Sequence, residues 1–273
     1  MNSLFWSGDR RSLGIAVVIS FLLALSSGVY ACSDVEKTAL ANVVAGVKEE
    51  IILEGYSGLD FTFTEVKCKP WPAMREYSIL VNPYTYAFSN GRVDGAYLGA
   101  VVVVIDSKSG EVTGSLNDRR ISEVDAISLK SIFIDAARYR LSDDGVAFGI
   151  RFLQANQSSA TPLQEEFMNL YIPKGRGFKS VARGLLTSSY SGEGDGWCVF
   201  EGGASNSIFV MGTGIAHNMR DIQVVKTDRR ISSRQINNGC SRTESVSGSV
   251  RVLLKFDGEQ YKVPDEIKSS LSL

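Results

Sequence analysis

The chain has 273 residues, a formal net charge of −1 and 44% hydrophobic residues. This length permits one large domain or two small ones, with a substantial hydrophobic core. A nearly neutral chain lacks the clustered basic excess that nucleic-acid-binding proteins carry, so we expect no nucleic-acid partner.

Residues 1–31 have the layout of a secretory signal peptide. The basic pair Arg10-Arg11 precedes an uncharged apolar run, Leu13–Leu25, and small residues follow up to Ala31. The apolar run is shorter than the ~20 residues that a membrane-spanning helix needs, and an uncleaved anchor is the alternative interpretation. We therefore predict an exported protein, periplasmic or extracellular, with no transmembrane span once the signal has been removed.

The four cysteines predict two disulfides. Cys32, Cys68, Cys198 and Cys240 are well separated, and none forms the C-x-x-C pair of a zinc ribbon or a thioredoxin-like site. An even number of cysteines in an oxidising compartment is most simply explained by disulfide bonds. Of the three connectivities we favour Cys32–Cys68 and Cys198–Cys240, because each joins neighbours in sequence order.

Cys32 also permits a different interpretation. Cleavage after Ala31 would make it the first residue of the mature chain, where bacterial lipoproteins carry a lipidated cysteine. Tyr30 fits that pattern poorly, because the residues before such a cysteine are usually small. A lipid-anchored structural protein of the envelope is therefore one alternative for this chain.

A helix is expected directly after the leader. Ser33 and Glu36 have the spacing of a capping box, in which each side chain bonds a free amide of the first turn. Apolar residues then recur at three- and four-residue spacing from Leu40 to Ile51, which predicts an amphipathic helix packed on a sheet. This helix should end near Gly55.

From Leu59 onward the hydrophobic pattern changes to period two, which predicts strands. The unbroken apolar run Tyr97–Ile105 is expected to be a central strand covered on both faces. The expected strands are Tyr77–Val81, Tyr84–Phe88, Tyr97–Ile105, Glu111–Leu116, Ala126–Ile134, Val146–Leu153, Phe167–Ile172, Phe178–Leu186, Trp197–Phe200, Ser207–Met211 and Asp221–Thr227.

A hairpin is predicted near the C-terminus. Val250–Phe256 and Gln260–Val263 flank Asp257-Gly258-Glu259, where Asp-Gly suits a turn with positive φ. The expected fold is mainly β: an antiparallel two-sheet sandwich or barrel-like domain, with one N-terminal α-helix packed on the sheet. The loop-like stretch Gln154–Pro162 is the best candidate boundary. It divides the mature chain into residues 32–160 and 161–273, unless the two form one continuous domain.

Part of the C-terminal third resembles a known family. Asp221–Val225, followed by Leu254–Tyr261, is similar to the sheet segments of FG-GAP-like β-repeats in exported bacterial proteins. The similarity lies within Asn206–Pro264, and the Asp-rich calcium loop of those repeats is absent. The resemblance implies a β architecture and an exported location.

A second resemblance concerns catalysis. Asn238–Arg242, downstream of His217, resembles the catalytic segment of L,D-transpeptidases, with Asn218 and Ser241 departing from the family pattern. The resemblance implies a cysteine-dependent cell-wall enzyme with Cys240 as nucleophile, His217 as base and Arg242 as substrate contact. A disulfide at Cys240 would exclude this role, and a cysteine in a turn paired with Cys198 is the alternative.

The aromatic residues favour binding over catalysis. Trp71, Tyr84 and Tyr86 lie in proline-containing segments that would hold them rigid as a contact surface, although they would equally serve as core residues. The single histidine, His217, excludes a multi-histidine metal site, and no phosphate-binding glycine motif is present, so we expect no metal or cofactor. The favoured function is a non-catalytic exported protein of the inhibitor, immunity or envelope-interaction type. Its partner would be another exported protein, an envelope component or a glycan.

Overall fold

The computed structural model describes residues 31–53, 66–89, 94–143 and 145–273. The signal sequence up to Tyr30 and the expected helix end near Gly55 lie outside these residues. The elements are α1 (Asp34–Leu53), β1 (Lys67–Pro70), β2 (Tyr77–Ser89), β3 (Asp94–Asp106), β4 (Val112–Val124), β5 (Ser128–Arg140), β6 (Val146–Ala155), β7 (Leu163–Lys174), β8 (Gly177–Gly194), β9 (Phe200–Ala216), β10 (Met219–Ile236), β11 (Gly239–Leu254) and the 3-10 turn η1 (Asp265–Ile267).

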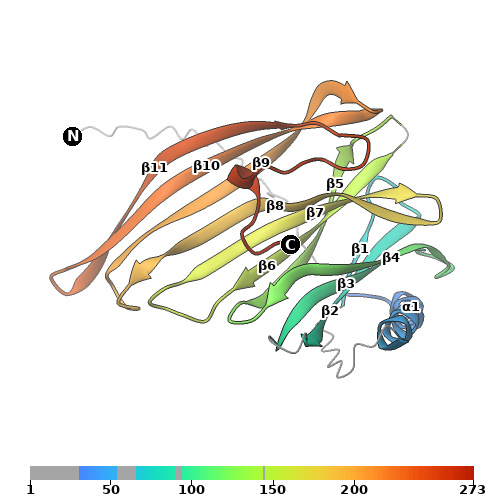
Figure 1. Ribbon diagram of the computed structural model, residues 1–273, viewed down its shortest axis with the longest axis horizontal. Coiled ribbons are helices and arrows are strands. Elements are labelled where there is room, and N and C mark those ends of the chain that lie inside the picture. The colour runs from blue at the N-terminus through green and yellow to red at the C-terminus, as the bar shows by residue number, and fades with distance from the viewer. Residues whose placement is uncertain (1–30, 54–65, 90–93, 144) are drawn as a thin grey trace, which may run out of the picture.

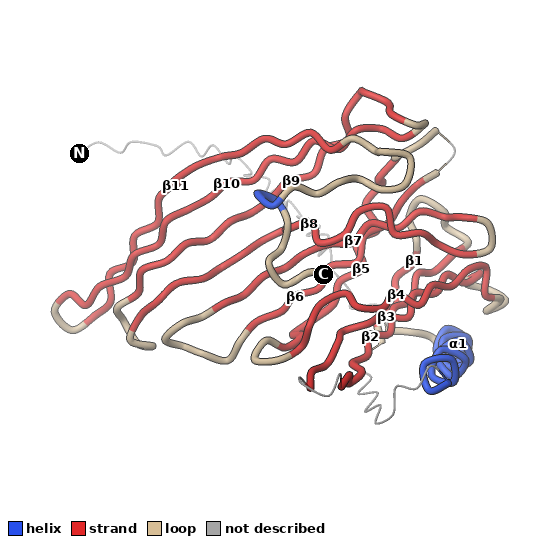
Figure 2. Tube along the Cα trace, viewed as in Figure 1, coloured by secondary structure: helices blue, strands red, loops and turns tan. Residues whose placement is uncertain are grey.

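The strands form two antiparallel series. In β1–β4 and in β5–β11, each strand pairs with the next along the chain, and the larger series makes one long twisted sheet (Figure 1). The two series join where Ser115 of β4 pairs in parallel with Gly177 of β8. Apart from α1 and the 3-10 turn, the described chain is strand or loop (Figure 2). The predicted mainly-β fold with one N-terminal helix on the sheet is confirmed.

The main core lies between β1–β4 and β5–β7. Residues from both sheets contribute, and β3 stands at its centre because it is covered on both faces. Val102 and Val104 face the opposing sheet, whereas Val101 and Val103 face α1. The residues that form this core are Trp71, Ile79, Val81, Leu98, Ala100, Val102, Val104, Ile121, Ile132, Ile134, Ala136, Phe148, Ile150, Phe152, Phe167 and Tyr171.

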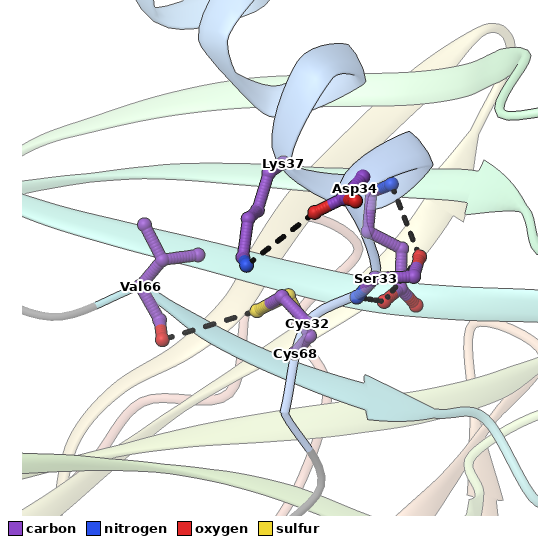
Figure 3. The surroundings of a disulfide bond; sticks show 7 residues. Cys32, Ser33, Asp34, Lys37, Val66 and Cys68 are labelled. Carbon is purple, nitrogen blue, oxygen red and sulfur yellow. Dashed lines mark hydrogen bonds and ion pairs between the residues drawn. A yellow bond between two sulfur atoms is a disulfide. The ribbon is translucent and has the colours of Figure 1, made fainter.

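The start of α1 follows the predicted capping box. The Ser33 amide donates to Glu36 Oε2 at 2.7 Å, and the Glu36 amide donates to Ser33 Oγ at 3.3 Å. Immediately before it, Cys32 is bonded to Cys68 of β1, with the Cα atoms 5.3 Å apart (Figure 3). The bond fixes the helix start to the sheet edge. It also occupies the sulfur to which a lipid would be attached.

The C-terminal segment differs from the predicted hairpin. The Asp257–Gln260 turn forms, with the Asp257 amide donating to the Gln260 carbonyl at 3.1 Å, but only Phe256 and Tyr261 pair across it. The expected first strand instead belongs to β11 and pairs with β10. The expected second strand is replaced by a contact with β8, because the Tyr261 amide donates to the Val181 carbonyl at 2.7 Å.

Two further expectations concern strand boundaries. Asn82-Pro83 does not separate two strands but lies inside β2. Among the described residues β1 pairs with β2 only as far as Val81, so no described strand on that side needs the amide that proline lacks. The candidate domain boundary at 154–162 connects β6 to β7, which pair directly with one another.

The disulfides indicate an oxidising, exported environment, since such bonds persist mainly outside the cytosol. Within the part of the chain that the structure describes, no helix combines the length and the apolar character needed to cross a bilayer.

Candidate binding surface

The aromatic residues that sequence reasoning placed on a contact surface are buried. The exposed fractions of Trp71, Tyr84 and Tyr86 are 1%, 0% and 2%. Trp71 packs edge-on against Phe148, with ring centroids 5.2 Å apart, and the Tyr84 hydroxyl donates to Asn117 Oδ1 at 2.5 Å. Burial raises the pKa of Tyr84, so this hydroxyl stays protonated as a donor. The prediction of a contact surface at these residues is wrong, because α1 covers one face of β1 and β2 and β5–β7 cover the other.

The expected catalytic pair is not brought together. Cys240 is bonded to Cys198 and therefore has no thiolate with which to attack a carbonyl. His217 lies in the turn before β10 and Cys240 in β11 just after the turn that follows β10. The 18 residues of β10 separate these two turns by about 60 Å at the usual rise of a strand. Arg242, the expected substrate contact, lies with Cys240 and far from the imidazole.

A different set of residues meets at the end of the long sheet where β8 turns into β9 and β10 into β11, which we call the distal end. Here a shallow groove of about 280 Å³ opens between the β6–β7 loop, the β8–β9 loop and the strand ends. The residues lining this distal groove are Ser159, Pro162, Tyr190, Gly196, Trp197, Cys198, Val199, Phe200, Ser233 and Arg242.

The aromatic floor of the distal groove depends on two glycines. The rings of Tyr190 and Phe200 stack with centroids 5.3 Å apart and planes inclined by 10°. To reach Tyr190, the Phe200 ring passes over Gly192 and Gly202, where an added Cβ would lie 2.5 and 2.6 Å from its Cζ. A side chain at either position would displace the ring, so these glycines set the shape of the floor.

The β8–β9 loop holds Trp197 at the rim. Asp195 Oδ1 accepts hydrogen bonds from the amides of Trp197 and Cys198 at 2.8 Å and of Val199 at 3.0 Å. These bonds hold the pKa of Asp195 below its usual value. The adjacent disulfide from Cys198 to Cys240 ties the loop to β11. Trp197 is nevertheless 86% exposed, and Val199 beside it is 47% exposed.

The strand register places an arginine next to this aromatic floor. Phe200 of β9 pairs with Ser233 of β10, and Ser233 pairs with Arg242 of β11. Directly paired residues share one face of a sheet, so these three side chains form a row. Among the described residues, no carboxylate lies within ion-pair distance of Arg242.

The opposite face of the distal end carries its own charge network. Glu201 accepts a hydrogen bond from Ser232 Oγ at 2.6 Å and lies 3.6 and 3.7 Å from the guanidinium groups of Arg230 and Arg234. The Ser232 hydrogen bond, followed by the two arginines, lowers the pKa of Glu201. Glu201 thus contacts both arginines of this face, whereas Arg242, on the groove face, has no carboxylate within ion-pair distance among the described residues.

Comparison with known proteins adds no family. No protein-family model matches the chain, and neither a curated protein nor a solved structure matches it. Over the described residues, no group of three or more His, Cys, Asp or Glu side chains is arranged to hold a metal ion. The groups that the distal groove offers to a ligand are stacked rings, an exposed indole and a guanidinium group.

Proposed function

We propose that this protein is an exported binding protein that contacts another exported protein through its distal end. The single observation that carries this proposal is Trp197, a tryptophan 86% exposed on a loop that hydrogen bonds and a disulfide hold in place. Tryptophan is usually well buried, because leaving its large apolar surface in water is unfavourable. An exposed indole on a fixed backbone is typical of a residue whose burial occurs in a complex.

The composition of the distal groove supports a protein partner. Tryptophan, tyrosine and arginine are enriched among the residues that dominate binding energy, and Trp197, Tyr190 and Arg242 meet here. Its volume of about 280 Å³ lies at the lower limit for small-molecule sites. It suits one inserted side chain. The proposed partner presents an apolar side chain to the aromatic floor and a carboxylate to Arg242.

The fixed loops around the distal groove also support this proposal. The β6–β7 loop is tied to β8, since the Gly194 amide donates to the Ala160 carbonyl at 2.7 Å. On the other side Asp195 and the Cys198–Cys240 bond fix the loop of Trp197. A surface that is already ordered loses little conformational entropy on binding, which raises affinity without additional contacts.

Site-specific photocrosslinking in the producing cells tests the proposal. A photoreactive amino acid replaces Trp197 in one variant and Val112, which is 39% exposed at the far end of the molecule, in the control. We expect a discrete light-dependent protein adduct from position 197 that is absent from position 112. The adduct should be lost when Arg242→Glu reverses the charge beside the aromatic floor.

Two outcomes contradict the proposal. Equal adducts from both positions, or none from position 197, exclude a partner specific to the distal end. Saturable binding of glycans on an array, without a protein adduct and abolished by Trp197→Ala, would assign the distal groove to a glycan instead.

A further inference from the structure

A second hollow lies at the opposite end of the molecule. There the β1–β2, β3–β4, β5–β6 and β7–β8 turns gather, as the pairs Tyr77 with Asp106, Arg140 with Val146 and Lys174 with Gly177 show. A pocket of about 360 Å³ opens between the two sheets where the main core ends. The residues lining this basal pocket are Pro72, Ala73, Arg75, Glu76, Arg138, Arg140 and Val146.

Both sheets supply arginines to the basal pocket. Arg138 and Arg140 lie at the C-terminal end of β5, next to the β5–β6 turn. Arg75 lies in the connection between β1 and β2. Earlier in β5, the main core buries Ile132, Ile134 and Ala136. The strand therefore changes from apolar to basic as it leaves the core and reaches the pocket.

A bulge in β5 shapes this region. Asp135 pairs with Gly149 and Tyr139 with Ala147, so three residues of β5, including Arg138, stand opposite the single residue Phe148. The Asp135 carboxylate holds the bulge by accepting from the Ala137 amide at 3.1 Å and from the Tyr139 hydroxyl at 2.9 Å. Bulges of this kind redirect side chains at sheet ends and next to functional sites.

The three guanidinium groups have no anionic partner in the part of the chain that is described. No carboxylate of the described residues lies within ion-pair distance of Arg75, Arg138 or Arg140, although Glu76 lines the same pocket. Elsewhere arginines find partners: Arg151 binds Asp135, and Arg183 binds Asp118. Like charges around one hollow repel each other, and an anion placed among them removes that repulsion.

We propose that the basal pocket binds a phosphate or sulfate group carried on a larger molecule. Guanidinium forks match the oxygens of these anions and donate paired charge-assisted hydrogen bonds. The three guanidinium groups of the basal pocket carry more positive charge than a single carboxylate would neutralise. The pocket is larger than an isolated oxyanion, and Pro72, Ala73 and Val146 give it apolar walls on which the remainder of the ligand would rest.

Isothermal titration of the full-length mature protein tests this site with inorganic phosphate, inorganic sulfate and glucose 6-phosphate as probes. Vesicles of phosphatidylcholine, with and without phosphatidic acid, test a lipid headgroup by co-sedimentation. The test variant is the pair Arg138→Gln and Arg140→Gln. The matched control is Arg230→Gln with Arg234→Gln, which removes the same charge from two exposed strand arginines at the distal end. Thermal unfolding confirms that both variants are folded.

We expect at least one phosphate-bearing or sulfate-bearing probe to bind wild type at least about tenfold more tightly than the test variant, with the control within about twofold of wild type. Binding of glucose 6-phosphate alone identifies a soluble ester as the source, and sedimentation only with phosphatidic acid identifies a lipid headgroup. The proposal is overturned if no probe binds saturably up to about 10 mM, or if both variants lose binding equally. Because the two ends are tested by separate variants, this result is independent of the proposed function.

Discussion

Arg183 of β8 and Asp118 of β4 form an ion pair at 2.7 Å across the seam where the two series of strands meet. Asp118 is 4% exposed, and its other oxygen accepts a hydrogen bond from the Tyr171 hydroxyl at 2.5 Å. Burial, followed by the charge of Asp118, raises the pKa of Tyr171, so the hydroxyl remains a donor. The network joins β4 to β7 and β8, whereas backbone pairing connects β4 to β8 only at Ser115 and Gly177.

Replacing Asp118 should therefore destabilise the whole fold. Asp118→Asn leaves Arg183 without its counter-charge, and breaking a buried pair in this way costs about 3–5 kcal/mol. Urea unfolding followed by tryptophan fluorescence measures the loss. The control is Asp143→Asn, whose exposed carboxylate pairs with Arg220 at 3.0 Å and should cost less than about 1 kcal/mol. Equal losses in the two variants would contradict the structural role of the network.

The C-terminal segment should be released by a single substitution in β7. Glu165 accepts hydrogen bonds from Ser269 Oγ at 2.5 Å and from the Ser270 amide at 3.0 Å, and it is 8% exposed. Glu165→Ala should speed hydrogen exchange of the Ser269 and Ser270 amides and lower stability by about 2–3 kcal/mol, since hydrogen bonds to a charged group are strong. The exposed Glu193→Ala serves as control. Unchanged exchange at residues 269–270 would show that the segment is held by other contacts.

The two disulfides should stabilise different parts of the protein. Replacing Cys198 and Cys240 by serine should cost about 2–4 kcal/mol and speed exchange of the Trp197 and Val199 amides. Replacing Cys32 and Cys68 should affect α1 and leave the distal end unchanged, because that bond lies at the helix start. Exchange measured peptide by peptide separates the two effects. Faster exchange at the distal end in both variants would argue against a local role for the Cys198–Cys240 bond.

Asp135 should contribute to acid sensitivity. Burial alone would raise the pKa of this carboxyl, but hydrogen bonds from Arg151, the Ala137 amide and the Tyr139 hydroxyl outweigh burial and lower it. A carboxyl whose pKa is lower in the folded state stabilises fully above its unfolded value of about 3.9, and this contribution is lost as the pH falls through the folded pKa.

Asp135→Asn should therefore lower the free energy of unfolding near neutral pH and flatten its decline below about pH 4. Urea titrations at a series of acidic pH values measure both effects. The control is Asp125→Asn, at an exposed carboxylate, which should leave the pH dependence of the free energy of unfolding unchanged. If the free energy of unfolding of the Asp135 variant fell with decreasing pH as steeply as that of wild type, other carboxylates would be responsible for the loss of stability in acid.

Local patterns in the sequence predicted local structure well. The capping box at Ser33 and Glu36, the apolar strand around Val102 and the disulfide pairs all rest on short-range chemistry or on simple order along the chain. The long strands β8–β11 were predicted only in pieces. Most side chains in their distal halves are exposed or half-buried, and serine, glycine and charged residues interrupt the period-two pattern by which a strand is recognised.

The candidate sites depend on distant contacts and so escaped prediction. Trp71 and Tyr84 are core residues only because α1 and β5–β7 cover β1–β4, which no local pattern reveals. The stack of Tyr190 on Phe200 requires Gly192 and Gly202 to lie side by side in neighbouring strands. Glycines repeated within a strand pattern were the available signal, since they often mark a close approach by another group.

The most direct measurement of the central claim is the affinity of the crosslinked partner for purified variants of the distal end. Trp197→Ala removes the exposed indole without altering the bonds that Asp195 makes to the backbone. Truncating a dominant contact residue costs at least about 2 kcal/mol, so the dissociation constant should rise about 30-fold. Val112→Ala should leave it within about twofold of wild type. An unchanged affinity in the Trp197 variant would contradict the assignment of the distal end as the binding surface.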